Sequence, residues 1–496
     1  MTPPVRLALV PLDERPVNVQ LPVDVARIAG ARIAVPPETL LPSFRTGADL
    51  DGLAAWVREQ AMDGETSDLL VSLDTLVYGG LIPSRTTTAG TMESLRRTTV
   101  LEDVATARPD LRIDAVSLVM RASNSDNPTE EPAYWKDHGR ALHAFGGAVH
   151  RSDGESDVAP LDAFTAAPAV VVEDFSLRRL RNHTVTLRAL EMHAAGVLSS
   201  LAITADDTAV HSAGSAEQAI LRHWLRMIPS GRRVRMYPGA DDVGATLVSR
   251  SLASRSDRPV RIRAVAGQPD GLALVPPYEN QPLSASLRSQ VEVAGGVLVD
   301  TDPDIVLVLH TPDPDRHDMY AGPPRVVDTA AVDATARAAA AALETGLPVA
   351  LADVRYPNGA DAALADRLLA DGALLRLDSY SAWNTSGNSL GSVIALAVAA
   401  EVGRRCGTLD RAAQEEALLR RLLDDYVYQS VVRPALAEQW FDSQPGQVPV
   451  PRAQEAAAAA HALVAEHLDR WGTGWTLRSL THPWDRNFEV ELTLGR

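Results

Sequence analysis

Two pairs of adjacent aspartates, each directly after a short apolar stretch, have the type and spacing best suited to chemistry. Asp206 and Asp207 end the stretch LAITADD, and Asp241 and Asp242 end RMYPGADD. Branched apolar residues favour a strand and Asp disfavours its continuation, so each pair is predicted at the carboxyl end of a strand. Two acids held so close raise one pKa, as a general acid requires, unless a cation neutralises them. For any single Asp of these pairs, capping of the following helix is an equally good interpretation.

Polar residues also follow the other strands predicted in the first half of the chain. The strand at 6–10 runs into a stiff turn with three charges between two prolines, which is either a preorganised polar site or a self-satisfied ion pair. The strand at 68–73 runs into a segment with Asp, Tyr and Arg around a glycine pair, which are residue types suited to a hydroxylated ligand. The loop after 112–118 places Trp beside Tyr and carboxylates, which is typical of sugar-stacking surfaces. The substrate-binding residues predicted here are Asp13, Glu14, Arg15, Asp74, Tyr78, Arg85, Arg121, Asn124 and Trp135.

Two stretches in the second half add to the predicted binding residues. The segment ADVRYPNGAD follows a predicted strand, and the run SAWNTSGNSLG precedes a strongly apolar helix at 390–400. Asn or Ser before a helix supplies its N-cap, and the exposed N–H groups of the first turn bind anions or carbonyl oxygens. An amide side chain offers both a donor and an acceptor, which suits hydroxyl or acetamido groups. The binding residues predicted in these stretches are Asp353, Arg355, Trp383, Asn384 and Asn388.

The elements that must position these residues alternate between strand and helix. Strands that are mostly apolar throughout indicate parallel sheets covered by helices, so an α/β fold of βα units is predicted. We expect an N-terminal α/β domain at 1–260 with acidic strand tips, a smaller α/β domain at 261–405 and a mainly helical region at 406–496. The N-terminal sheet is either open and Rossmann-like or barrel-like. A strand is predicted at 374–378 and a first helix at 22–28.

Composition excludes several classes of protein. The chain has 496 residues with a net charge of −17, so it lacks the basic excess that nucleic acid binding requires. No apolar run is long enough for a membrane span and no leader precedes the first strand, so no membrane partner and a cytoplasmic location are expected. The only cysteine is Cys406, which excludes a Cys-based zinc site. Lys136 is the only lysine, which argues against P-loop and Schiff-base chemistry.

Five motifs in order carry a resemblance to a known family. PLDERPVN, SLDTLVYGGLIPSR, ITADD, YPGADDVG and WNTSGNSLG resemble the bacterial domain-of-unknown-function 4127 family over nearly the whole chain. The resemblance implies a family but no mechanism. The adjacent aspartates of ITADD also look loosely like those of N-acetylglucosaminidases that use the acetamido group of their own substrate.

The leading hypothesis is a hydrolase that acts on a carbohydrate, most simply a glycosidase, with a small-molecule or oligosaccharide substrate. An N-acetylated sugar is one option for that substrate. Asp206 and Asp207 are the predicted catalytic pair, followed by Asp241 and Asp242, because glycoside hydrolysis uses two carboxyl groups with different roles. No cofactor or metal is predicted for this reaction. One alternative is a hydrolase or phosphoryl-transfer enzyme that holds Mg²⁺ or Mn²⁺ between the aspartates. Another is a non-catalytic sugar-binding protein, and the oligomeric state is left open.

Overall fold

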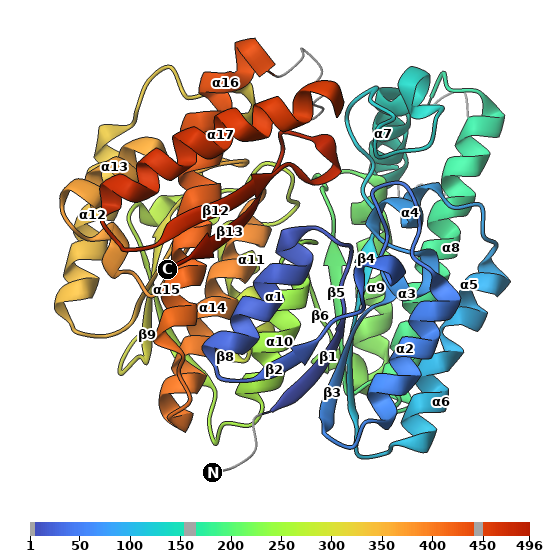
Figure 1. The fold of residues 1–496 in the computed structure, drawn as a ribbon. Helices are drawn as coiled ribbons and strands as arrows, with labels where there is room; N and C mark the ends of the chain where they lie inside the picture. The colour runs from blue at the N-terminus through green and yellow to red at the C-terminus, as the bar shows by residue number, and fades with distance from the viewer. Residues whose placement is uncertain (1–4, 153–164, 441–449) are drawn as a thin grey trace. The chain divides into compact units, whose positions relative to one another are not determined.

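The computed structural model of the chain describes residues 5–152, 165–440 and 450–496. These residues form two compact units. The colour in Figure 1 gives the position of each residue along the chain. The chain passes between the units several times, so neither unit is one continuous segment. The predicted domain limits at 260 and 405 stay a prediction. The first unit contains Met1–Glu14, Ala31–Leu247 and Tyr278–Gln281, and the second contains Arg15–Gly30, Val248–Pro277 and Pro282–Arg496.

The first unit is built on a six-stranded sheet in which every pair of neighbouring strands is parallel. The strand order is β2-β1-β3-β4-β5-β6, and β2 and β6 form the two edges, so the sheet is open within the described residues. The open sheet decides between the two arrangements that the pattern of strands and helices allowed. Its strands are β1 (Arg6–Val10), β2 (Arg32–Ala34), β3 (Thr66–Ser72), β4 (Arg112–Val119), β5 (Ser200–Ala205) and β6 (Arg235–Pro238).

The strands of the first unit are buried because their apolar residues face helices. Val71, Ile113 and Ile203 are fully buried in one core, with α2, α6 and α8 packed around it (Figure 1). The helices of this unit are η1 (Glu38–Leu40), α2 (Leu50–Met62), α3 (Leu73–Tyr78), α4 (Leu81–Thr86), α5 (Thr91–Arg97), α6 (Thr99–Ala107), α7 (Trp135–Arg151), α8 (Ala169–Ala194), α9 (Ala213–Met227), η3 (Pro229–Arg233) and the first part of α10 (Val243–Ala253).

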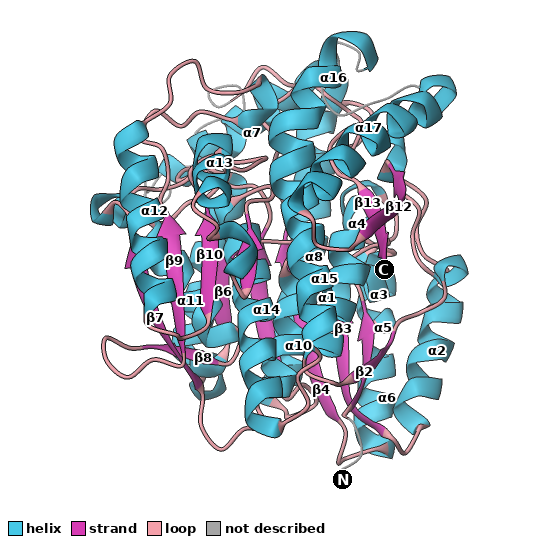
Figure 2. Cartoon of the chain, turned by 60° about the vertical axis from the view of Figure 1, so that its left-hand side comes forward, coloured by secondary structure: helices cyan, strands magenta, loops and turns pink. Residues whose placement is uncertain are grey.

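The second unit is built on a five-stranded parallel sheet with the order β11-β10-β9-β7-β8. Read from the other edge, the order is β8-β7-β9-β10-β11. If β7 is counted as strand 1 of this sheet, the order is 2-1-3-4-5. The strands β2-β1-β3-β4-β5 of the first unit have the same order. Figure 2 shows β7, β9 and β10 running in the same direction beside α12. The strands are β7 (Val260–Ala266), β8 (Gly296–Leu298), β9 (Ile305–His310), β10 (Val349–Asp353) and β11 (Ser379–Ser381).

Helices make up most of the rest of the second unit, and the chain ends in an antiparallel pair of strands. The two parallel sheets and the helical C-terminal region confirm the predicted α/β fold. No helix in the described parts of the chain is both long and apolar enough to span a membrane. The elements are α1 (Pro16–Ile28), η4 (Pro269–Ala273), α11 (Leu283–Val293), η5 (Met319–Ala321), α12 (Thr329–Glu344), α13 (Ala362–Ala370), η6 (Leu374–Arg376), α14 (Ser386–Cys406), α15 (Arg411–Arg421), the π-helix η7 (Leu422–Val432), α16 (Arg433–Trp440), α17 (Val450–Trp471), β12 (Thr476–Thr481), η8 (Pro483–Asp485) and β13 (Glu491–Gly495).

Two predicted elements were misplaced. The strand expected at 374–378 is a 3₁₀ turn followed by β11, because Leu374 and Leu377 serve the core as buried turn residues. The first helix begins at Pro16 rather than near 22, since proline at the first helical position needs no hydrogen-bond donor. Pro16 therefore starts a helix as well as stiffening the turn.

Candidate functional site

The polar residues predicted at strand ends in the first unit gather at one edge of its sheet. Parallel strands share the edge at which they end, so the residues that follow them are neighbours there. The strand order reverses between β1 and β3, and this topological switch point is where open parallel sheets bind ligands. The residues at this edge are Asp13 after β1, Asp74 after β3, Arg121 after β4, Asp206 and Asp207 after β5, and Asp241 and Asp242 after β6.

Two arginines and four acids form one network at this edge, which we name the carboxylate–arginine cluster: Arg85, Arg121, Glu130, Glu131, Asp206 and Asp207. The guanidinium of Arg85 is only 1% exposed and lies 2.5 Å from Asp206 Oδ2. It also lies 3.2 Å from Glu130 and 3.5 Å from Glu131. Arg85 is therefore surrounded by acids from two different loops.

Arg121 forms the outer half of the cluster. Its guanidinium lies 2.7 Å from Glu130, 2.8 Å from Glu131 and 3.2 Å from Asp207. The surrounding carboxylates raise the pKa of Arg121 well above its usual value, although burial opposes them. Both arginines are thus held as permanent cations among a larger number of acids.

Asp207 is the most exposed acid of the cluster. Its side chain is 32% exposed, compared with 10% for Asp206. The protein around the Asp207 carboxyl and the like charge of Asp206 raise its pKa to about 7, while Arg121 opposes the shift. The backbone N–H of Asp207 donates to Asp206 Oδ1 at 2.8 Å, which fixes the two side chains relative to each other.

Asp74 is a second acid with a raised pKa. It lies at the start of α3 and is 3% exposed. Burial raises its pKa to about 7, the charge of Asp206 adds to the shift, and the N–H of Leu118, which donates to Asp74 Oδ2 at 3.0 Å, opposes it. Asp74 is therefore close enough to the cluster to respond to its charge.

A glycine pair allows Arg85 to reach the cluster. Gly79 has φ +94° and Gly80 has φ +128°, which is backbone that other residues rarely adopt. A Cβ on Gly79 would lie 2.9 Å from the backbone nitrogen of Ala48, and one on Gly80 would lie 2.9 Å from Pro42 Cγ. The turn between α3 and α4 therefore requires glycine, and it directs Arg85 from the end of α4 toward the strand ends.

The other residues predicted in the first unit have different surroundings. Glu14 Oε1 accepts from the backbone N–H of Phe44 at 2.8 Å, and Asp13 is buried. The ring of Tyr78 lies under the guanidinium of Arg181, with 5.0 Å between them, and its burial raises its pKa well above the usual value. Asn124 is exposed. Roles for these residues in ligand binding stay predictions.

Trp135 and the second aspartate pair are also buried. The ring of Trp135 is 2% exposed and packs on Phe175, with 5.9 Å between ring centroids, so this geometry leaves it no open face for sugar stacking. Asp241 and Asp242 are buried directly before α10, and Asp242 Oδ2 accepts from the hydroxyl of Thr246 at 3.3 Å. This contact is to a side-chain hydroxyl, whereas a cap accepts a backbone N–H of the first helical turn, so the capping interpretation and the catalytic one both stay predictions for this pair.

The remaining predicted residues lie in the second unit, and each is described by its contacts there. Arg15 lies over the Trp484 ring at 4.6 Å and 3.6 Å from Glu489. Arg355 lies 3.3 Å from Asp313 and 3.0 Å from Asp328.

Trp383, Asn384 and Asn388 also have partners in that unit. Trp383 packs on Phe488 with 5.8 Å between ring centroids. The carbonyl of Asn384 accepts from Asn358 N at 2.8 Å, and the backbone N–H of Asn388 donates to the Thr385 cap of α14.

Asp353 belongs to a buried network in the second unit. Its Oδ2 accepts from the N–H of Asp361 at 2.7 Å and from the Tyr380 hydroxyl at 3.4 Å. His310 lies 3.1 Å from Asp361 and 2.8 Å from Thr335. Burial raises the pKa of Asp353 to about 6, while the neighbouring His310 opposes it. These groups are hydrogen-bonded to one another in the core, so the network is explained by a structural role.

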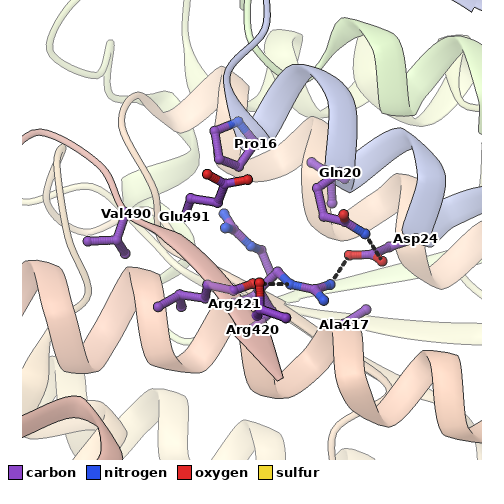
Figure 3. Close-up of a pocket in the computed structure, with 11 residues that line it drawn as sticks. Pro16, Gln20, Asp24, Ala417, Arg420, Arg421, Val490 and Glu491 are labelled. Atoms are coloured by element: carbon purple, nitrogen blue, oxygen red, sulfur yellow. Dashed lines mark hydrogen bonds and ion pairs between the residues drawn. The ribbon is translucent and has the colours of Figure 1, made fainter. Parts of the chain in front are cut away.

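A recess in the second unit is drawn in Figure 3, lined by residues from α1, α15 and β13. Arg420 is paired with Asp24 and lies 2.6 Å from Glu416, and Arg421 lies 2.8 Å from Asp424. The two guanidinium groups are thus already engaged by carboxylates of the protein.

Sequence reasoning missed several members of the site. Glu130 and Glu131 complete the cluster, and the available signal was an acidic doublet ten residues after Arg121. Ser72 and Thr204 line a recess beside Asp74. They gave no signal, since Ser and Thr near the end of a strand are ordinary. Among the described residues, no group of three or more His, Cys, Asp or Glu side chains is placed to hold a metal ion.

Comparisons with known proteins identify a family. The family described as "Protein of unknown function (DUF4127)" matches residues 7–493. No curated protein matches the chain. Among solved structures, Phytolacca americana UGT2 complexed with UDP-2fluoro-glucose and pterostilbene is similar at 10% sequence identity and a TM-score of 0.22, over 85% of this chain and 95% of that one. A likeness of that size carries no argument about fold or ligand.

Proposed function

The chain belongs to the DUF4127 family, whose description assigns no activity, and from the carboxylate–arginine cluster we propose that it is a carbohydrate hydrolase, most simply a glycosidase. Asp207 is the general acid and Asp206 is the carboxylate that orients the substrate or stabilises its developing positive charge. Glycoside hydrolysis needs two carboxyl groups in these different roles.

The observation that carries the proposal is the difference between two adjacent aspartates. Asp206 is held by the buried guanidinium of Arg85, which favours a fixed carboxylate. Asp207 is one-third exposed, and its surroundings raise its pKa to about 7, so a large fraction holds a proton near neutral pH. One environment thus supports a charged group and the other supports a proton donor, as acid–base catalysis of this kind requires.

The proposed reaction follows from these roles. The Asp207 carboxyl gives its proton to the glycosidic oxygen as the bond from that oxygen to the anomeric carbon breaks. The Asp207 carboxylate then takes a proton from the water whose oxygen bonds to the anomeric carbon. The products are a sugar with a free anomeric hydroxyl and an alcohol, and Asp207 regains its proton.

The test is a screen of the purified chain against chromogenic glycosides, including N-acetylated ones. Asp207→Asn should lower kcat on any active substrate by about 10²–10⁴, because an amide cannot donate the proton. Asp103→Asn is the matched control, since Asp103 is an exposed acid paired with Arg58 at 3.5 Å in the same unit. Equal activity in wild type and Asp207→Asn would contradict the assignment.

A hydrolase or phosphoryl-transfer enzyme that depends on Mg²⁺ or Mn²⁺ is a second proposal, which rests on the acidic residues at the strand ends. Metal analysis after dialysis, combined with assays in a chelator, separates the two proposals. Stoichiometric Mg²⁺ or Mn²⁺ with activity lost to the chelator would favour the metal. Glycoside hydrolysis that is unaffected by the chelator would favour the two carboxyl groups acting alone.

A further inference from the structure

A narrow recess in the first unit adjoins the site and is not used by the proposed acid–base pair. It lies between the carboxyl ends of β1, β3, β4 and β5 and the start of α10. Its walls are mostly aliphatic, with Leu9, Val116 and Leu247 among them. Because it includes the ends of both β1 and β3, it opens at the switch point of the sheet.

Two hydroxyl groups line this recess, and within the described part of the chain neither is hydrogen-bonded to the protein. Ser72 Oγ and Thr204 Oγ1 are buried, and neither has a hydrogen-bond partner among the described residues. Ser72 is paired in register with Val116, and Thr204 with Leu118, so the two hydroxyls and these aliphatic side chains face the same side of the sheet. A buried hydroxyl without a partner destabilises the folded state, so a small polar group that enters the recess and pairs with both hydroxyls would be stabilised there.

Asp74 is the third polar group of the recess. It links the recess to the carboxylate–arginine cluster, because the charges of Asp206 and Arg85 both act on its carboxyl. No arginine or lysine is present among the described residues that line the recess. An anionic group there would meet the Asp74 carboxyl and aliphatic walls without a cation to neutralise it, which is unfavourable.

We propose that this recess is a subsite for a short uncharged substituent of the substrate, held by hydrogen bonds to the hydroxyls of Ser72 and Thr204. The substituent carries one or two hydrogen-bonding atoms, as a hydroxyl or an amide does, and only its small polar end enters, because the recess is narrow and lined mostly by aliphatic side chains. That it belongs to a sugar rests on the proposed function. That it is uncharged follows from the recess itself.

The experiment measures binding and stability together on the full chain. Calorimetric titrations use glucose, N-acetylglucosamine and glucuronate as hydroxyl, amide and anionic probes, with wild type, Ser72→Ala and Thr204→Val. The matched control is Ser117→Ala, because Ser117 lies between Val116 and Leu118 on β4 and its hydroxyl is paired with Thr186 at 2.8 Å. Melting temperatures are recorded for each variant.

We expect Thr204→Val and Ser72→Ala to keep or raise the melting temperature, because they remove hydroxyls that have no protein partner. They should weaken binding of the tighter neutral probe about three- to tenfold, the usual effect of one lost hydrogen bond. Ser117→Ala should lower the melting temperature and leave the affinity unchanged. Glucuronate should bind wild type more weakly than glucose does, and the tighter of the two neutral probes identifies the group as hydroxyl or amide.

The inference is overturned if no probe binds, if glucuronate binds as tightly as glucose, or if Thr204→Val behaves like Ser117→Ala in both measurements. Its failure is distinguishable from failure of the proposed function. Neutral probes that bind through these hydroxyls, with no glycoside hydrolysed, would overturn the hydrolase alone. Hydrolysis that neither hydroxyl variant changes would overturn the subsite alone.

Discussion

At the scale of single residues, two acids at one sheet edge differ in access rather than in proton affinity. Asp74 and Asp207 both have a pKa raised to about 7, mainly by loss of solvation. Asp74 is buried, whereas Asp207 is one-third exposed. Only Asp207 can therefore exchange a proton directly with a ligand that arrives from solvent, and Asp74 acts on the site through its charge.

The pH dependence of the proposed hydrolysis follows from Asp207. Its protonated form is the active one, so kcat should fall about tenfold per pH unit above a midpoint near 7. This fall in rate above pH 7 is the basic limb of the pH–rate profile. The residual activity of Asp207→Asn should not show it, because the variant lacks the carboxyl group that titrates. A pH–rate series for both proteins checks this. A basic limb that persists unchanged in the variant would assign it to another group.

Asp74 should make the stability of the fold depend on pH. Its pKa in the folded state is about 7, above the ordinary value of 3.8, so protonation of Asp74 favours the folded state. This contribution to the free energy of unfolding is fully present below pH 3.8 and is lost as the pH rises through 7. The loss is at most on the order of 4 kcal/mol. Asp74→Asn should therefore stabilise the fold relative to wild type at pH 8, and the difference should shrink toward pH 4.

Denaturant unfolding of both proteins at several pH values measures this difference. Asp110→Asn is a suitable control, because Asp110 is an exposed acid whose pKa is lowered by Arg108 and its hydrogen bonds. It should not show a gain in stability at pH 8. A difference between Asp74→Asn and wild type that is constant with pH would mean that Asp74 does not titrate in this range.

Asp206 and Asp207 could be predicted at the edge of the sheet because apolar strands followed by acids have a clear local signature. The contacts that give them different environments could not, because Arg85 lies in α4 whereas Glu130 and Asp206 lie in two separate loops. Their meeting depends on strand order, which the pattern of apolar residues does not encode. For Trp135 the local sequence pointed to the wrong environment. The polar residues around it suggested an exposed loop, but its side chain is buried in a hydrophobic cluster.

At the scale of elements, the turn between α3 and α4 decides whether Arg85 reaches the acids. Gly79→Ala would place a Cβ at φ +94° and 2.9 Å from the backbone of Ala48. We expect a loss of at least about 1–2 kcal/mol in the free energy of unfolding, with a larger fall in activity because Arg85 shifts. Gly64→Ala is the control, since nothing lies within 4 Å of its added Cβ and its φ is not positive.

Denaturant unfolding and kinetic assays of both glycine variants test this expectation. A Gly79→Ala protein as stable and as active as Gly64→Ala would show that the turn tolerates a side chain. Loss of stability without any further loss of activity would separate the turn's structural role from the positioning of Arg85.

At the scale of the whole molecule, the two units share a strand order that the sequence does not reveal as a repeat. Both sheets read 2-1-3-4-5 from their own first strands, and the first adds β6. Strands of a parallel sheet need only be apolar on both faces, and many different sequences meet that requirement. Two sheets can therefore have the same strand order without similar residues at equivalent positions. The α/β class could therefore be predicted from the alternation of elements, whereas the matching order could not.

A division of the chain into consecutive segments assigns helix α1 to the wrong unit. Helix α1 belongs to the second unit although it precedes most of the first, and it packs there on α14 and α15. Its buried side chains include Val17, Leu21 and Val25. A fragment of residues 248–496 therefore lacks part of its own core, a deficit on the order of 5 kcal/mol for three buried aliphatic side chains.

We expect that fragment to bind a hydrophobic dye and to unfold without a cooperative transition, because the faces of α14 and α15 that α1 covers are open to water. The matched protein joins residues 15–30 to the same fragment through a flexible glycine–serine linker. It should regain a cooperative transition and lose most of the dye binding. Near-ultraviolet circular dichroism and dye fluorescence compare the two. A cooperative fragment without α1 would show that residues 248–496 form a sufficient core, and that α1 only covers it.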